Sequence, residues 1–455
     1  MVRRWPRQLD LRGWLALLAG RGELRVLYGE IDPDQDVAAV LAYADGKYAV
    51  RFEAVRGAAF PLVGNTVPSR EHLALAMGCP EPEVLDKLAD ALRFPRPCAV
   101  VEPAAAPVLG TCRTDGDLLD DLPLPVQHAG DAGRYFTSAL VAVRDPRTGK
   151  VNLSVNRLQA SGPRELRTLM LPGRLRSIFT ACEASGTDLP VALCVGVDPL
   201  LLLASQSPPD ADLDDLEVAS ALYPAPLEVV HVDGLDFAVP ARAEMLLTGK
   251  FVAGRTAMEG PFGEFPRTIG PGGPGPVVEL AARWSRRDAC LQTILSSGRE
   301  HFWVGGLPRE ARLLRALRTA GVDVAEVRLT EGGSCRLHAV ISIHAARPGI
   351  ARHAAMVAFT AVATVKYVVV VDSDVDIFDS EQVEWAIATR VQADRDLLVV
   401  PRTVGSGLDP SNGAGTTAKL AIDATIPDGE YERFARIASI PRALRAHLDE
   451  LEAAR

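Results

Sequence analysis

Two glutamates flank a Gly-Pro turn near the middle of the chain and could together hold and transfer a proton. Glu259 and Glu264 stand in the segment Glu-Gly-Pro-Phe-Gly-Glu, where a loop of glycine and proline can direct both carboxylates into one cavity. Two carboxyl groups held close together, or one buried beside Phe262 or Phe265, acquire separated pKa values, which is how a general acid is made at neutral pH. A solvated surface loop is the simpler alternative, because charged residues are mostly exposed.

A second polar group alternates along a strand predicted over residues 151–157. Asn152, Ser154 and Asn156 fall on one face of that strand, and Arg157 falls on the other. An arginine among the apolar residues of a half-buried strand requires a carboxylate partner, which its planar guanidinium binds through two parallel hydrogen bonds. The pattern therefore indicates a buried arginine–carboxylate pair, with an ordinary surface salt bridge as the alternative.

A third cluster is acidic and follows an apolar strand predicted over residues 367–371. Asp372, Asp374 and Asp376 alternate at the carboxyl end of this strand, where α/β sheets bind ligands and where oxygen atoms suit Mg²⁺ or Mn²⁺. On this interpretation the protein would be a metal-dependent transferase of nucleotide sugars or phosphoryl groups. A polar strand end followed by a helix cap at Asp379 is the structural alternative.

The elements that must position these residues form three units. Helix and strand patterns mix in the first hundred residues, strands dominate the centre, and helices alternate with strands in the last third. The expected fold class is a multidomain α/β (α+β) protein with domains at residues 1–108, 109–300 and 301–436. Residues 437–455 carry an apolar stripe at three- and four-residue spacing, which predicts a terminal helix and a candidate subunit contact.

Six predicted elements bear on the candidate residues or on the unit that carries them. Hydrophobic periodicity predicts helices over residues 174–184, 307–320 and 380–390, and apolar runs predict strands over 242–248 and 324–329. The run at residues 270–276 consists of glycine and proline alone. We expect it to be a loop, because it can hold neither a helix nor a central strand.

Composition excludes several classes of protein. The chain has 455 residues, of which 48% are hydrophobic and 24% charged, as in an ordinary folded protein. Its net charge of −9 has the wrong sign for binding a phosphate backbone, so no nucleic-acid partner is expected. Seven cysteines without C-x-x-C or zinc spacing predict free, mostly buried thiols in a reducing compartment. No apolar segment reaches the roughly 18 residues of a spanning helix, so we expect a cytoplasmic protein without a membrane partner.

The two central motifs together resemble the UbiD-type decarboxylase family. Asn152 is followed by Arg157 and later by Glu-Gly-Pro-Phe-Gly-Glu, in that family's order. The resemblance covers nearly the whole chain. Further matching segments lie at residues 10–12, 22–25, 237–241, 243–244, 331–336 and 418–425.

The resemblance implies a fold, a cofactor and a reaction. The central unit would be a split β-barrel-like domain that binds prenylated FMN, which a separate flavin prenyltransferase supplies. The reaction would be reversible nonoxidative decarboxylation of an aromatic, heteroaromatic or α,β-unsaturated carboxylic acid through a covalent adduct with prenylated FMN. The family is usually a homodimer or a higher homo-oligomer.

The resemblance also implies roles for the candidate residues. Arg157 would bind the substrate carboxylate, Glu259 would hold Arg157, and Glu264 would deliver the proton that replaces CO₂. Their presence argues against a noncatalytic flavin-binding homologue. The residues that would contact the cofactor are Asn152, Ser154, Val155, Asn156, Arg157, Met170, Leu171, Arg174 and Lys419.

Two metal ions belong to the implied site, a divalent ion such as Mn²⁺ and a monovalent K⁺ or Na⁺. Asn152 and Asp215 match two ligands of the divalent ion, whereas Arg174 stands near the position of the expected histidine. Arginine stays protonated and cannot ligate a metal, so Arg174 could instead contact the cofactor phosphate and replace part of the metal's charge. Backbone oxygens at Ala204 and Ser205 would hold the monovalent ion.

Overall fold

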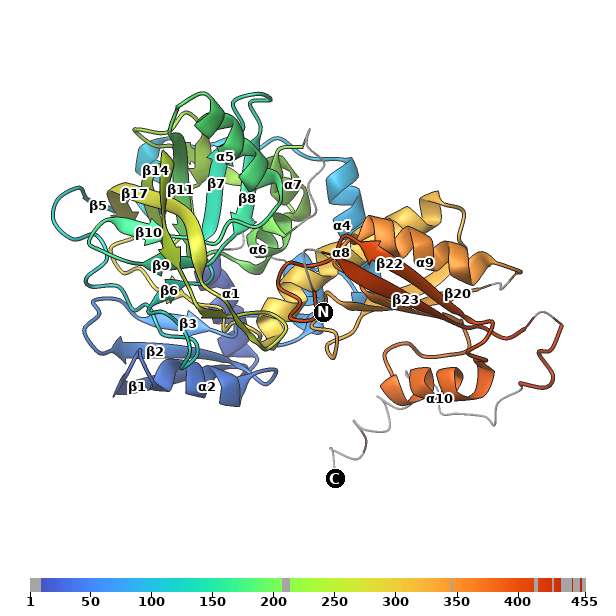
Figure 1. The fold of residues 1–455 in the computed structure, drawn as a ribbon. Coiled ribbons are helices and arrows are strands. Elements are labelled where there is room, and N and C mark those ends of the chain that lie inside the picture. Colours follow the sequence, from blue (N-terminus) through green and yellow to red (C-terminus); the bar gives the residue numbers. More distant parts are fainter. Residues whose placement is uncertain are drawn as a thin grey trace.

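Sheets of four, nine and five strands organise the chain (Figure 1). The computed structural model describes residues 10–206, 213–344, 347–412, 416–427 and 429–434, together with Leu444 and Leu451. Three members of the predicted C-terminal stripe, Ile437, Ile440 and Leu448, lie outside these residues. No helix in the described ranges is both long and apolar enough to cross a membrane.

The N-terminal unit is a four-stranded sheet with helices, in the order β1-β2-β3-β18. Its first helix forms because Asp10 caps it by accepting from the Gly13 N–H, and because its leucines and Trp14 recur on one buried face. The elements are α1 (Leu11–Gly20), β1 (Leu24–Ile31), α2 (Asp36–Ala44), β2 (Ala49–Val55), β3 (Leu62–Gly64), α3 (Arg70–Met77), the 3₁₀ helix η1 (Glu81–Glu83) and α4 (Val84–Arg93).

The central unit is a nine-stranded, mainly antiparallel sheet in the order β6-β9-β10-β17-β14-β11-β7-β8, with β5 beside β17. Smaller sheets join β13-β12-β4 and β15-β16. The elements are β4 (Ala99–Val100), η2 (Pro103–Ala105), η3 (Pro107–Leu109), β5 (Thr111–Arg113), β6 (Tyr135–Phe136), β7 (Leu140–Arg144), β8 (Val151–Val155), β9 (Leu158–Ala160), β10 (Glu165–Arg167), α5 (Arg174–Ala184), β11 (Leu189–Val195), α6 (Pro199–Ser205), α7 (Asp215–Leu222), β12 (Glu228–His231), β13 (Ala238–Pro240), β14 (Met245–Glu259), β15 (Phe262–Gly263), β16 (Ile269–Gly270), β17 (Gly273–Ser285) and β18 (Leu291–Gln292).

The C-terminal unit is a five-stranded sheet in the order β19-β20-β21-β23-β22, whose inner strands β20, β21 and β23 are parallel. The helix that opens it, α8, packs against α4, α6 and α9 and so joins all three units (Figure 1). The elements are α8 (Arg299–Thr319), β19 (Val324–Leu329), β20 (His338–Ile343), α9 (Ile350–Ala361), β21 (Tyr367–Asp372), α10 (Ser380–Arg390), β22 (Leu397–Thr403) and β23 (Thr417–Ala424).

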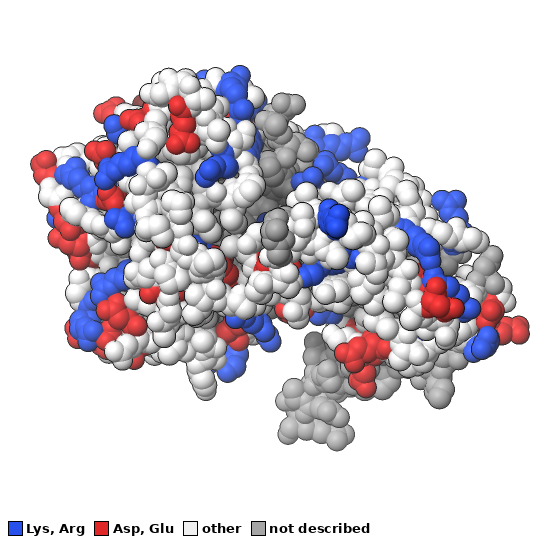
Figure 2. Space-filling model, viewed as in Figure 1, with Lys and Arg blue, Asp and Glu red and all other residues white. Residues whose placement is uncertain are grey.

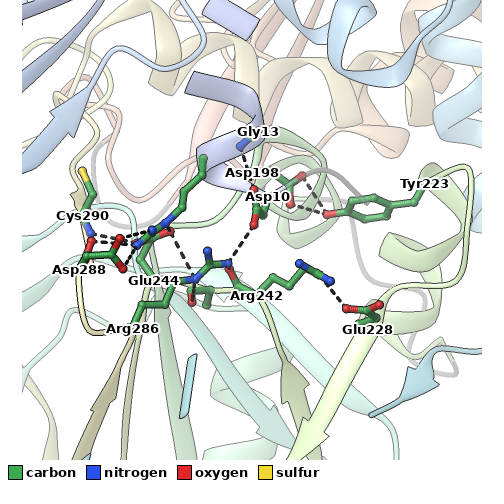
Figure 3. Close-up of polar contacts among 12 residues, drawn as sticks. Asp10, Gly13, Asp198, Tyr223, Glu228, Arg242, Glu244, Arg286, Asp288 and Cys290 are labelled. Carbon is green, nitrogen blue, oxygen red and sulfur yellow. Dashed lines mark hydrogen bonds and ion pairs between the residues drawn. The ribbon is translucent and has the colours of Figure 1, made fainter. Parts of the chain in front are cut away.

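Two polar clusters tie the N-terminal helix and α6 to the central sheet (Figure 3). Glu244 accepts two hydrogen bonds of 2.9 Å from Arg12 of α1 and one of 3.0 Å from the Cys290 N–H. Asp198 caps α6 and accepts from the Tyr223 hydroxyl at 2.7 Å, and burial raises the pKa of Asp198 to about 7. The amino end of α6 is thereby anchored deep in the unit.

The prediction of a loop over residues 270–276 is wrong for residues 273–276. Residues 273–276 begin β17 and pair with the end of β14, where Glu259 lies opposite Gly273. Proline is tolerated at the beginning of a strand, where fewer ladder bonds need its missing N–H. The glycines permit close backbone approach, since a Cβ on Gly275 would lie 2.1 Å from the Thr168 carbonyl oxygen.

Two further predicted boundaries need correction. The strand predicted over residues 151–157 ends at Val155, so Arg157 lies in the connection to β9 and strand alternation does not set its direction. Helix α8 begins at Arg299 rather than at residue 307, because a buried helix tolerates Gly305, Gly306 and Pro308, which the pattern treats as breakers. The prediction for α10 is confirmed at both ends.

The visible surface carries both signs of charge. Figure 2 shows Lys and Arg interspersed with Asp and Glu over the three units. The cysteines are all free thiols, four of them buried, which confirms that part of the expectation. Only Cys112 among them is exposed.

Candidate active site

A cavity of about 580 Å³ lies between the central and C-terminal units. The central unit contributes the end of β8, the beginning of α5, the end of α6 and the segment around Glu264. The C-terminal unit contributes one face of α8, Arg336 and residues of two loops. This volume is within the range of cofactor and small-molecule sites.

Arg157 connects the two predicted glutamates at the wall of this cavity. Its Nε donates to Glu259 Oε1 at 2.9 Å and its Nη2 donates to Glu259 Oε2 at 2.8 Å, the parallel geometry expected from the sequence. Its Nη1 contacts Glu264 Oε1. The Glu259 side chain is fully buried, so it serves to fix the guanidinium, whereas Arg157 and Glu264 both line the cavity.

The segment that carries Glu264 is held by residues that no sequence motif indicated. Asp131 Oδ1 accepts from the Gly263 N–H at 2.7 Å, and the Ser296 hydroxyl donates to the Gly263 carbonyl. The Glu264 N–H itself donates to the Thr268 carbonyl at 2.8 Å. Asp131 and Ser296 are distant from Glu264 in sequence, so only the folded chain shows that they position the acid.

Asp215 and Arg174 form a second ion pair at the β8 end of the cavity. Arg174 Nη1 donates to Asp215 Oδ1 at 3.1 Å. Asp215 Oδ2 accepts from Asn152 Nδ2 at 2.9 Å and from the Leu153 N–H at 2.8 Å. Burial raises the pKa of Asp215 to about 6, against the opposing effect of Arg174. Asn152 and Arg174 line the cavity.

A third group of cavity side chains comes from α8 and the loop before β20. His301, Gly305 and Arg309 follow one another at four-residue spacing and so share one face of α8. Arg336 lies over Gly305, where a Cβ would come within 1.7 Å of its Nη2. Sequence reasoning passed over His301 and Arg309, because a lone histidine and a lone arginine carry no motif, and it placed Arg336 only within the matching segment 331–336, without a role.

The two arginines of this group have no carboxylate partner in the described ranges. Arg309 donates to the Gly305 carbonyl, and Arg336 donates to the Cys335 carbonyl at 3.2 Å. Burial lowers the pKa of Arg336 to about 10, and burial together with the charge of Arg336 lowers the pKa of Arg309. The pKa of His301 falls to about 3, chiefly through burial and then through both arginines. This end of the cavity therefore holds uncompensated positive charge.

Family models match nearly the whole chain. Models of 3-octaprenyl-4-hydroxybenzoate carboxy-lyase match as the N-terminal domain at residues 15–92, the Rift-related domain at 99–299 and the C-terminal domain at 302–424. The chain belongs to the UbiD family. It is accordingly a decarboxylase of the carboxy-lyase type, and the resemblance inferred from Arg157 and the two glutamates is confirmed.

Solved structures and curated relatives agree with the UbiD assignment. The chain is similar to the UbiD-class enzyme HmfF from Pelotomaculum thermopropionicum in complex with FMN, with 47% identity, a TM-score of 0.92, and coverage of 95% of this chain and 98% of that one. An evolved dimeric form of HmfF in complex with prFMN shows 44% identity and a TM-score of 0.89, over 96% and 99% of the two chains. Anhydromevalonate phosphate decarboxylase of Methanothermobacter thermautotrophicus is 36% identical over 378 residues, 83% of this chain and 88% of that protein.

The remaining residues predicted for the UbiD site fall into two groups. Ser154, Val155, Asn156, Met170, Leu171 and Ser205 line the cavity. Ala204 and Lys419 are buried outside its lining. Lys419 Nζ donates to the Ala363 carbonyl at 2.8 Å and to the Phe359 carbonyl at 3.2 Å, and burial lowers its pKa to about 8.

The acidic strand end of β21 is neutralised rather than open to a metal. Arg390 is fully buried and donates to Asp374 Oδ2 at 2.6 Å and to Asp372 Oδ2 at 3.4 Å. Asp372 Oδ2 also accepts from the Ile426 N–H at 2.6 Å. Asp379 caps α10, as its structural alternative predicted. The transferase interpretation of Asp372, Asp374 and Asp376 therefore finds no support in these contacts.

The cavity fits a flavin phosphate better than it fits a divalent metal. Arg174 and the beginning of α5 offer N–H donors there, which suit a phosphate. Asn152 Oδ1 is a buried acceptor without a partner, and among the described residues it is the one feature here that suits a cation. No group of three His, Cys, Asp or Glu side chains in the described part of the chain could hold a metal. For the divalent metal that the resemblance implied, Asn152 Oδ1 is the one free side-chain oxygen of this cluster in the described residues. The Asp215 carboxylate beside it already accepts hydrogen bonds from Asn152, Leu153 and Arg174.

Proposed function

We propose that this UbiD-family enzyme removes CO₂ nonoxidatively and reversibly from a planar aromatic, heteroaromatic or α,β-unsaturated acid that carries a second anionic group. The observation that supports this is the presence, in one cavity, of the Arg157–Glu259–Glu264 cluster and of Arg309 and Arg336, which have no carboxylate partner among the described residues. The cofactor is prenylated FMN from a separate flavin prenyltransferase. When bound, it supplies the electron sink that a carbanion at an sp² carbon needs.

The residues at the Glu264 end divide the work. Arg157 binds and orients the carboxylate that leaves, since its side chain lines the cavity next to Glu264. Glu259 prevents the guanidinium from turning, because two parallel hydrogen bonds fix its plane. Glu264 holds the proton that replaces CO₂, and Phe262, 4.9 Å below the Arg157 guanidinium, excludes water from the pair.

The second anion belongs to the substrate because of where Arg336 lies. Its guanidinium is 5.8 Å from the ring of Phe265, the neighbour of Glu264 in sequence. The flavin phosphate belongs with Arg174 and Asn152, on the β8 side of the cavity. Two buried guanidinium groups without a counterion destabilise the empty site, and a ligand carboxylate or phosphate removes that penalty. Anhydromevalonate phosphate decarboxylase, a relative, has by its name a substrate with a phosphate.

The reaction is tested on protein coexpressed with a flavin prenyltransferase and purified without oxygen. Mass spectrometry of the released small molecules should find prenylated FMN in stoichiometric amount, and CO₂ release should follow addition of a suitable acid. Absence of any flavin, or bound prenylated FMN with no turnover of any acid in a broad panel, would contradict the proposal.

The second anionic group is tested with matched acids on the same ring, for example the monocarboxylates and dicarboxylates of furan, pyrrole and benzene. Wild-type kcat/KM should favour the dicarboxylate of a pair. Arg309→Met and Arg336→Met should each lower kcat/KM for the dicarboxylate by about tenfold to a hundredfold, the value of a charge-assisted hydrogen bond, and leave the monocarboxylate unaffected. Arg312→Met, a partly exposed arginine on α8 outside the cavity, is the control. Equal losses for both acids would argue against this subsite.

A further inference from the structure

We infer that the phosphate of the flavin cofactor is held by Arg174 and the amino end of α5, without a divalent metal. The inference rests on the proposed function in one respect, that the cofactor is a flavin phosphate. It concerns the part of the cavity where Asn152, Asp215 and Arg174 meet. Three observations support it, from the carboxylate, the arginine and the helix.

The Asp215 carboxylate already accepts three hydrogen bonds from the protein. One oxygen accepts from Asn152 Nδ2 and the Leu153 N–H, and the other accepts from Arg174 Nη1. A divalent ion at this carboxylate would have to displace a guanidinium and stand beside its positive charge. Asn152 Oδ1 is the one unpartnered oxygen of this cluster in the described residues, so a divalent ion here would have a single free protein ligand and would depend on water and the phosphate for the others.

Arg174 is placed as a permanent cation with spare donors. It is buried and lines the cavity, and its Nη2 donates to the Leu213 carbonyl at 2.7 Å. Two of the five N–H groups of its guanidinium have protein acceptors among the described residues, and the buried Nε has none. A phosphate oxygen is the acceptor that a rigid arginine fork binds best.

The amino end of α5 adds backbone donors at the same place. The helix has 11 residues, begins at Arg174, and has no side chain that caps its first turn. The first N–H groups of a helix lack intrahelical partners, and the helix dipole makes this end favourable for an anion. Gly173, Arg174 and Leu175 all line the cavity, so these donors and the guanidinium face one ligand.

The experiment measures flavin binding rather than turnover. The full chain, freed of metal with EDTA, is titrated with FMN and with riboflavin, which lacks the phosphate, in the presence of EDTA or of added Mn²⁺. The Kd for FMN should agree within about twofold in the two conditions. Holoenzyme from coexpression with a prenyltransferase should keep its flavin through EDTA treatment and contain far less than one Mn per flavin by elemental analysis.

Variants connect this binding to the arginine. Arg174→Gln should raise the Kd for FMN about tenfold or more and leave the Kd for riboflavin unchanged, because only the phosphate contact is lost. Arg176→Ala, which removes an exposed arginine from the same helical turn, should change neither Kd. Since Arg174→Gln leaves Asp215 buried without a cation, the double variant Arg174→Gln/Asp215→Asn removes both charges and should show the same selective loss.

Two outcomes would overturn the inference. One is FMN binding that requires Mn²⁺ or is lost in EDTA, and the other is equal weakening of FMN and riboflavin in the Arg174 variants. Failure of the proposed function is distinguishable from these, since flavin would then bind without metal but no acid would be decarboxylated. A chain that binds no flavin in any condition would overturn both.

Discussion

The two ends of the cavity differ in how their charge is balanced. At the Glu264 end, Arg157 is bound by Glu259 through two hydrogen bonds and contacts Glu264. At the α8 end, Arg309 and Arg336 donate only to main-chain carbonyls among the described residues. Both ends are buried, so the difference is one of charge and not of exposure to water.

The difference distinguishes positioning from recognition. A compensated buried pair keeps a side chain in one geometry whether or not a ligand is present. An uncompensated cation pair costs free energy until an anion arrives, and thus makes binding depend on the ligand's charge. The balanced end should therefore control rate and fold, and the unbalanced end should control which acid is accepted.

The largest effect expected is on turnover at the balanced end. Glu264→Gln keeps the size of the side chain but cannot donate an acidic proton. The turnover number kcat should therefore fall by about 10³-fold or more. The thermal midpoint should stay close to that of wild type, because the amide can still contact Arg157. Glu279→Gln, at an exposed position of β17, is the matched control. Near-normal turnover in Glu264→Gln would remove this residue from the proposed role.

The next effect concerns the stability of the same end. Glu259→Gln removes the charge of the fully buried Glu259, so that Arg157 keeps one amide oxygen there and Glu264 as its carboxylate contact. The free energy of unfolding should fall by about 3 kcal/mol, at the lower end of the cost of breaking a buried ion pair. Urea unfolding of apo protein at pH 7.5 measures it, with Glu279→Gln again as the control. A change below about 0.5 kcal/mol, the size of an ordinary surface substitution, would show that the pair does not stabilise the fold.

The opposite sign is expected at the unbalanced end. Arg309→Met removes a half-buried cation that has no carboxylate partner among the described residues and keeps most of the apolar volume, so the apo protein should become more stable by about 2 kcal/mol. Arg312→Met on the same helix should be close to neutral. If Arg309→Met instead lowers the free energy of unfolding as much as Glu259→Gln does, the charges at the two ends of the cavity are balanced alike. The proposed difference between the two ends would then be wrong.

The sequence predicted the balanced end and missed the unbalanced one, for a physical reason. A glutamate in a Gly-Pro turn and an arginine on an apolar strand are locally conspicuous, and their pairing follows from charge. Arg309 belongs to no motif, and Arg336 belongs only to the matching segment 331–336. Their lack of a carboxylate partner among the described residues depends on every element around them. The same holds for Asp131, whose contact with Gly263 joins segments 132 residues apart.

The fold shows the same limit at its boundaries. The strand and helix patterns of the C-terminal unit predicted β19 and α10 to the residue, since local periodicity and a cap decide them. The same patterns failed for the first turns of α8, where burial outweighs the low helix propensity of Gly305, Gly306 and Pro308. His301 lies in those turns, so the sequence did not place it on the helix.

The smallest expected effect tests the unbalanced end through pH. His301 has a pKa lowered from 6.5 to about 3, first by burial and then by Arg336 and Arg309, so the unfolded chain binds one more proton than the folded chain between these values. Stability should therefore be full above pH 6.5 and decline as the pH falls toward 3. Between pH 7.5 and pH 5.5, the free energy of unfolding should fall by about 1 kcal/mol less in His301→Asn than in wild type. Urea unfolding at the two pH values measures this, and adding a dicarboxylate that binds the wild type should narrow the gap, because an anion beside His301 offsets the two arginines. An equal decline in both proteins would mean that His301 does not sense the unbalanced charge.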